Sequence, residues 1–285
     1  MIQSKGFSVS AIGLGLVSVT LAQNFAQLGG TSSARGVILL GLPGTLALSA
    51  ASLLFCAIAL RYNLFSAQTW TGRLVSAAFL VWFGVELAGT VLQAQAVCRQ
   101  QFSSNALIGL LPLLVLLSWR MENHAINYTA RILWWVLLVG GIACLLGLGG
   151  RMHWQRLFGP EPASLWAAGL PQLRLYPEYF ALPLLCTKGK ERSGALLPFW
   201  CFGIQAGYTL ALELVLGRMR SPEYTGIELL RAWGMGYFSR LDALLVLFWL
   251  ATALFRICFL ICCLRLLWRE GLGFRPVKTE KEGTA

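Results

Sequence analysis

The sequence predicts an all-α polytopic membrane protein with about eight transmembrane helices. Of its 285 residues, 57% are hydrophobic and only 12% are charged, whereas a soluble domain averages about 25% charged residues. Apolar runs long enough to cross roughly 30 Å of hydrocarbon recur along the chain. These observations predict one integral membrane domain over residues 1–268 and a basic cytoplasmic tail at 269–285, which we expect to be disordered.

Hydropathy divides the membrane domain into eight expected spans. These are roughly 7–28, 37–60, 74–97, 104–119, 132–150, 164–186, 194–216 and 238–267. The first run is too long for a signal peptide, so we expect it to be retained. Lys and Arg are more numerous in the loops on the side of the N-terminus, which predicts that both termini are cytoplasmic.

The sixth expected span contains "LPQLRLYPEYFALPLL", residues 170–185, with three prolines and two charged residues, Arg174 and Glu178. Proline removes a backbone donor and breaks a helix, and open backbone at membrane depth must be shielded by protein or face a water-filled cavity. The segment therefore predicts a discontinuous helix that lines a cavity, with a surface or re-entrant hairpin as the alternative. Arg174 and Glu178 are four apart and would pair if that piece were helical.

The first expected span offers a second position for a break. The stretch "GLGLVSVTLAQNF" contains Gly13, Gly15, Ser18 and Thr20, where unwinding a helix costs little. In a fold with an inverted repeat, this span would be the counterpart of the sixth. We therefore expect helices 1 and 6 to be broken, with Ser18 and Thr20 near the cavity.

Charged residues inside the expected spans are the other informative positions, because a charge at mid-bilayer costs at least about 2.5–3.5 kcal/mol. Glu86 lies near the middle of the third span, where it is either paired structurally or part of a solute or proton pathway. Arg256 lies inside the eighth span and is a candidate structural partner of Glu86 or Glu178. Arg240 and Asp242 open the eighth span, and we favour a structural role for both.

Other function classes have little support in the sequence. The net charge of +11 is dispersed among apolar segments, which argues against nucleic-acid binding. The two histidines, His124 and His153, fall in expected loops, and no H-E-x-x-H, G-x-S-x-G or Walker motif occurs. Most cysteines lie inside apolar runs, where they act as small hydrophobes. We therefore expect no catalytic residues, no metal site and no cofactor.

Three stretches carry a family resemblance. In "FSRLDALLVLFWLATALFRI", residues 240–242 and Trp249 resemble the eighth helix of the GerAB-type spore-germination permeases, which belong to the amino acid–polyamine–organocation superfamily. In "LYPEYFALPLLCTKGK", Tyr176 and Glu178 resemble an aromatic–Gly–Glu motif of the sixth helix, with Pro177 in place of the glycine. The stretch "ALRYNLFSAQTW" is similar to the second helix and its following loop.

The resemblance implies a fold of two inverted five-helix repeats, with broken first and sixth helices at a site for a small nutrient such as an amino acid. It also implies germinant receptor A and C subunits as partners in the bacterial inner (spore) membrane. The family has ten spans, so we expect this chain to lack the last two. The candidate ligand-binding residues are Ser18, Thr20, Glu86, Arg174, Tyr176 and Glu178, and those of the eighth helix are Arg240, Asp242 and Arg256.

Two alternative functions remain at this stage. One is a proton-coupled amino acid permease with Glu86 or Glu178 as the proton carrier. The other is a subunit that binds no ligand and serves assembly alone.

Overall fold

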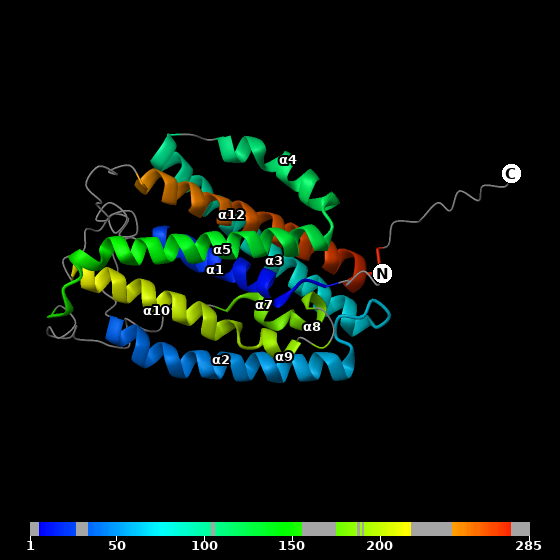
Figure 1. Cartoon of the computed structure of the whole chain (residues 1–285). Coiled ribbons are helices and arrows are strands. Elements are labelled where there is room, and N and C mark those ends of the chain that lie inside the picture. The colour runs from blue at the N-terminus through cyan, green and yellow to red at the C-terminus, as the bar shows by residue number, and fades with distance from the viewer. Residues whose placement is uncertain are drawn as a thin grey trace.

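The computed structural model describes residues 6–26, 34–103, 106–155, 175–186, 189, 191–217 and 241–274. Its helices pack side by side in one bundle (Figure 1). The long helices are α1 (Val9–Ala26), α2 (Ala34–Tyr62), α3 (Trp70–Phe102), α4 (Ala106–Arg120), α5 (Asn123–Leu148), α10 (Leu197–Leu216) and α12 (Leu241–Leu266). The short elements are η1 (Gly149–Arg151), α7 (Pro177–Phe180), α8 (Leu182–Leu185), α9 (Glu191–Gly194) and the π-helical turn η4 (Leu267–Gly271).

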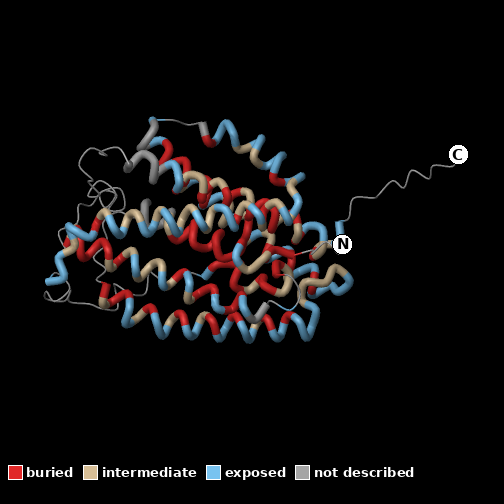
Figure 2. The backbone as a smooth tube through the Cα atoms, viewed as in Figure 1, coloured by how far each residue is buried: buried red, intermediate tan, exposed pale blue. Residues whose placement is uncertain are grey.

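The helices have the length and polarity of membrane spans. Five stretches of the described chain are long and apolar enough to cross a bilayer, in α2, α3, α5, α10 and α12, and α1 and α4 are shorter apolar helices. Large apolar side chains such as Leu54, Val85 and Leu146 are exposed on the outside of the bundle, and the buried residues gather at its centre (Figure 2). This distribution confirms an all-α, membrane-embedded protein, because lipid replaces water around the outer surface.

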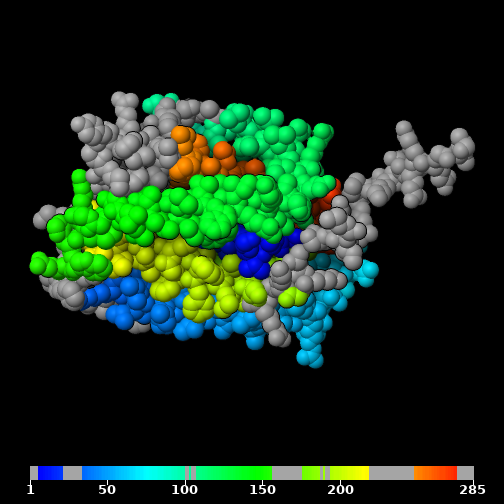
Figure 3. Space-filling view, in the orientation of Figure 1, coloured from blue at the N-terminus to red at the C-terminus, as the bar shows by residue number. Residues whose placement is uncertain are grey.

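Helices α1 and α12 occupy the centre of the bundle. Helix α1 contacts α3, α5, α10 and α12, and α12 also contacts α4. In the space-filling view, α1 is visible only in a small area between α5 and α10 (Figure 3). Phe259 in α12 is fully buried and packs edge-on against Phe7, with ring centroids 5.2 Å apart. Helices α3, α4, α5 and α10 therefore pack around these two helices, and α2 packs on α10.

The expected break in the first helix is wrong, because α1 is continuous from Val9 to Ala26. Its glycines serve close packing instead: a Cβ at Gly15 would lie 3.0 Å from the Phe259 ring and 3.2 Å from a guanidinium nitrogen of Arg256. The hydroxyls of Ser18 and Thr20 donate to the carbonyls of Gly15 and Leu16 in the preceding turn. The small and polar residues therefore pack and bond within a regular helix.

The expected break in the sixth span is confirmed over its described part, residues 175–186. This part forms two four-residue helices, α7 and α8, that are joined at Ala181. Pro177 and Pro183 lie in the first turns of α7 and α8, where the missing N–H costs no helical hydrogen bond. The remainder of the expected span, 164–174, lies outside the described residues.

The start of α5 differs from expectation. Helix α5 begins at Asn123, well before the expected residue 132. His124 therefore lies in a helix, and its expected loop position is wrong. The polar first turns of α5 are held by α1, since the Asn127 side chain accepts a hydrogen bond of 2.8 Å from the Ser8 N–H. This contact explains why the helix extends beyond the apolar run.

The expected tail, residues 269–285, begins inside an ordered element. The π-helical turn η4 runs to Gly271, and Phe274 stacks on Trp268 with ring centroids 4.6 Å apart. Gly271 packs directly on Ser76 of α3, which joins the end of α12 to α3. Residues 275–285 lie outside the described part of the chain.

Replacing Gly271 by alanine is expected to lower the apparent melting temperature of the detergent-purified protein. The new Cβ would lie 2.4 Å from the Oγ of Ser76 and 2.6 Å from its Cβ, which the α3 backbone holds in place. Over-packing of this kind costs about 1–3 kcal/mol. Gly203→Ala in α10 is the matched control, because that glycine is exposed and an added Cβ there has no described atom within 4 Å. The control should melt at or above the wild-type temperature, and equal melting of both variants would contradict the Gly271–Ser76 contact.

Candidate functional site

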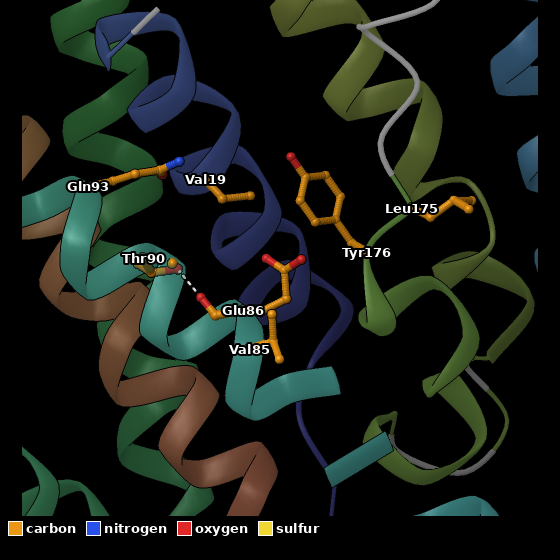
Figure 4. Close-up of a pocket in the computed structure, with 8 residues that line it drawn as sticks. Val19, Val85, Glu86, Thr90, Gln93, Leu175 and Tyr176 are labelled. Carbon is orange, nitrogen blue, oxygen red and sulfur yellow. Dashed lines mark hydrogen bonds between the residues drawn. The ribbon is translucent and has the colours of Figure 1, made fainter. Parts of the chain in front are cut away.

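A pocket of about 340 Å³ lies between α1, α3 and the chain that enters α7. Helix α3 supplies most of its wall, Val19 comes from α1, and Leu175 and Tyr176 precede α7 (Figure 4). Its lining residues are Val19, Val85, Glu86, Gly89, Thr90, Gln93, Leu175 and Tyr176. The pocket therefore adjoins the break that the prolines produce.

The pocket combines apolar walls with a few polar groups, as small-molecule sites do. Glu86 is half-buried and is the one charged residue among the described residues of the lining. The Thr90 hydroxyl donates to the backbone carbonyl of Glu86 at 2.8 Å, and the Glu86 side chain extends toward Tyr176 (Figure 4). Gln93 and Tyr176 add an amide and a phenol. Among the described lining residues there is one carboxylate and no basic side chain, which favours a ligand that carries a positive charge or a hydrogen-bond donor.

Tyr176 is positioned by the proline that follows it. Its backbone is extended, with φ −96° and ψ 140°, as expected for a residue before proline. The ring packs against Tyr179, with centroids 5.8 Å apart, and the side chain is 5% exposed. Pro177 thereby directs Tyr176 into the pocket wall while the chain turns into α7.

Behind this wall lies a buried ion pair. The guanidinium of Arg256 in α12 contacts the carboxylate of Glu178 in α7, and both side chains are 0% exposed. Of the two partners that the sequence offered for Arg256, the structure selects Glu178. Beyond this pair, the side-chain nitrogens and oxygens of the two residues have no hydrogen-bond partner within the described ranges. Glu178 was expected to line the cavity, but it lies in the core behind Tyr176 instead.

The structure brings together only some of the other candidate residues. Glu86 and Tyr176 meet in the pocket, whereas Ser18 and Thr20 are buried in α1 and only their neighbour Val19 reaches it. The pairing expected between Arg174 and Glu178 requires a helical turn between them. Leu175 and Tyr176 are not helical, so this requirement is not met.

Three candidates lie partly or wholly beyond the described residues. Arg174 and Arg240 are outside the described ranges. Asp242 lies in the first turn of α12, but its side chain is not described. The proposed roles of these residues stay predictions.

Sequence reasoning missed most of the α3 wall. Glu86, Thr90 and Gln93 follow at helical spacing, so they share one face of α3 and form a polar stripe in an apolar span. A polar stripe of this kind in a membrane helix faces protein or a cavity. The stripe was therefore a signal that the sequence contained.

A second buried carboxylate also has a structural partner. Glu213 near the end of α10 is 1% exposed, and its Oε2 accepts a hydrogen bond of 2.7 Å from the N–H of Ala34. Ala34 is the first residue of α2, so the carboxylate caps a helix N-terminus, where negative charge is favoured. The cap explains why this carboxylate is buried.

Within the described ranges, no group of three His, Cys, Asp or Glu side chains is placed to hold a metal ion. Comparison of the chain with models of protein families, with curated proteins and with solved structures finds no match. The site is therefore interpreted from its own geometry.

Replacing Arg256 alone by methionine is expected to destabilise the protein by about 3–5 kcal/mol, because Glu178 would remain buried without its partner. Replacing the pair together, Arg256→Met with Glu178→Leu, should recover most of that loss, since well-packed apolar side chains often substitute for a buried pair. Thermal unfolding and size-exclusion chromatography in detergent measure both variants. A single variant as stable as the wild type would argue that the two charges are not paired.

Proposed function

We propose that this chain is a membrane-embedded, transporter-like subunit that binds a small nutrient such as an amino acid in the pocket between α1, α3 and α7. The observation that carries the proposal is the position of Glu86, a half-buried carboxylate in a membrane span that lines a pocket beside a broken segment. Broken segments and intramembrane carboxylates are typical of substrate sites in transporters.

The size of the pocket supports a small ligand. Its volume of about 340 Å³ lies at the lower end of the range for small-molecule sites, roughly 300–1,000 Å³. An ammonium group placed at Glu86 would find a carboxylate, and the ring of Tyr176 offers an aromatic face to a cation. The apolar side chains of Val19 and Val85 suit the aliphatic part of such a molecule.

The family resemblance gives this binding activity a biological setting. The resemblance implies that the chain belongs to a spore germinant receptor in the inner membrane, with A and C subunits as partners and both termini in the cytoplasm. In that setting, ligand binding would trigger germination, and the chain would sense a nutrient instead of supplying it to the cell.

Glu86→Gln is expected to abolish ligand binding while leaving the protein folded, because the amide keeps the shape of the side chain and removes its charge. The measurement is the shift in melting temperature of the purified chain across a panel of free amino acids, among them L-alanine. Glu122→Gln is the matched control, since Glu122 is exposed and lies before α5, away from the pocket. We expect a shift with at least one amino acid in the wild type and the control, and none in Glu86→Gln.

The thermal-shift experiment also tests the assembly role. A wild-type chain that responds to no amino acid would contradict ligand binding and support a subunit that serves assembly alone. A response that survives Glu86→Gln would place the ligand elsewhere.

A proton-coupled permease is the second candidate, and the same carboxylate in the α3 span favours it. Liposomes that contain only this chain should then take up an amino acid, and uptake should collapse when an ionophore dissipates the proton gradient. Glu86→Gln should remove the dependence on the gradient, because it removes the titratable group. Binding without any uptake would support the sensing role instead.

A further inference from the structure

The pocket beside α3 has a buried floor and an exposed mouth. Val19, Thr90 and Tyr176 in its lining are buried. Val85 and Leu175 in the same lining are 64% and 60% exposed. These two apolar residues come from α3 and from the chain that enters α7, so they border the mouth from different elements (Figure 4).

The α3 side of the mouth belongs to the outer surface of the bundle. Val81, Val85 and Leu92 follow at helical spacing and are all exposed, so they share one outward face of α3. Gly89, a further lining residue, is exposed as well, and a Cβ added there has no described atom within 4 Å. The missing side chain of Gly89 therefore keeps the mouth open beside an apolar outer face.

The mouth lies near the middle of the membrane span. Glu86 is the only charged residue in the sequence between Arg73 and Arg99, and both arginines are exposed. At 1.5 Å per residue, each arginine is about 20 Å along the helix from Glu86. A bilayer with its interfacial regions is about 40–45 Å thick, so the two arginines reach opposite interfaces. Acyl chains therefore surround the outer face of α3 at Val85 and Gly89.

We propose that the pocket admits its ligand sideways from the bilayer, and that the ligand is a single-chain amphiphile. Its small head, a hydrogen-bond donor, lies in the pocket, and its hydrocarbon tail passes between Val85 and Leu175 into the lipid. The inference rests on the proposed function, since it takes the same pocket as the ligand site. It adds a class of ligand and a route of entry.

The pocket suits a head group that is neutral and donates a hydrogen bond, such as a hydroxyl. A neutral group crosses hydrocarbon at far lower cost than a charged one. Inside the pocket, Glu86, Gln93 and Tyr176 offer carboxylate, amide and phenol oxygens as acceptors. The two oxygens of a carboxylate accept several hydrogen bonds, so Glu86 can serve a protein group and a ligand together.

The test is photolabelling of the full chain in lipid nanodiscs. The probe is a straight-chain primary alcohol that carries a diazirine at the end of its alkyl tail, and mass spectrometry locates the residues that it labels. The same alcohol without the diazirine, added in excess, separates saturable labelling from general labelling by lipid-dissolved probe. We expect saturable labelling of residues 81–92 and of Leu175.

Gly89→Phe is expected to abolish the saturable labelling, because the ring would fill the mouth. Gly84→Phe is the matched control: an added Cβ there also has no described atom within 4 Å, and Gly84 is not among the described lining residues. Both variants should melt at or above the wild-type temperature, since glycine is a poor helix former. Gly89→Leu repeats the test with a smaller side chain.

Two results with these variants would overturn the proposal. One is the absence of saturable labelling in the wild-type chain. The other is labelling in Gly89→Phe and Gly89→Leu that equals labelling in Gly84→Phe, because the tail would then not pass the mouth.

A second arm needs no variant and asks whether the tail lies in lipid or in water. The competitor is a primary alcohol of equal length whose tail is a polyether. Each methylene kept in hydrocarbon contributes about a factor of four to affinity, so the polyether alcohol should compete at least about tenfold less well than the alkyl alcohol. Equal competition by the two would show that the mouth opens to water and would overturn the proposal.

These results are separable from the proposed function. A chain that responds to amino acids but shows no saturable labelling would keep the amino-acid site and lose the lateral entry. Saturable labelling that Gly89→Phe removes, in a chain that responds to no amino acid, would keep the lateral site and remove the amino acid as its ligand.

Discussion

The architecture depends on the ion pair between Arg256 and Glu178, which joins a central membrane helix to the one discontinuous segment of the described bundle. A charge buried in this environment must be paired, so the pair fixes where α7 lies relative to α12. Gly15 in α1 completes the arrangement, because its lack of a side chain allows the Arg256 guanidinium to approach the α1 backbone. The same contacts at Arg256 thus involve the continuous helix α1, the buried helix α12 and the broken α7–α8 segment.

The second constraint is the open backbone of the broken segment, which lipid does not satisfy. Protein groups provide the missing bonds: the Ser52 hydroxyl donates to the Tyr179 carbonyl at 2.6 Å, and the Phe7 N–H donates to the Leu185 carbonyl at 2.7 Å. The Ala181 N–H bonds within the segment, to the Pro177 carbonyl at 2.9 Å. Prolines and a carboxylate persist inside the bundle because α2 packs against α7 and α8, α3 packs against α7, and Arg256 of α12 pairs with Glu178.

The sequence predicted those features that depend on local physics. Apolar runs indicated the spans, and the prolines at 177 and 183 indicated the break, because each removes a helical donor wherever it occurs. The same reasoning failed for α1, since Gly15 suits close packing as well as unwinding and only the neighbouring helix decides between them. Charges in spans indicated that partners exist, but the choice of Glu178 over Glu86 for Arg256 depends on tertiary packing. The cap that Glu213 provides for α2 is non-local in the same way.

The two carboxylates near Arg256 differ in what they can offer a ligand. Glu178 is fully buried and paired with the guanidinium of Arg256, so its carboxylate is not open to a ligand in the pocket. Glu86 lines the pocket, and the lining residues that the structure describes include no Lys, Arg or His. The charge among the described lining residues is therefore negative, which disfavours an anionic ligand and favours a cationic one. The pairing with Arg256 thus withdraws Glu178 from the pocket, and Glu86 is the carboxylate that a ligand would meet there.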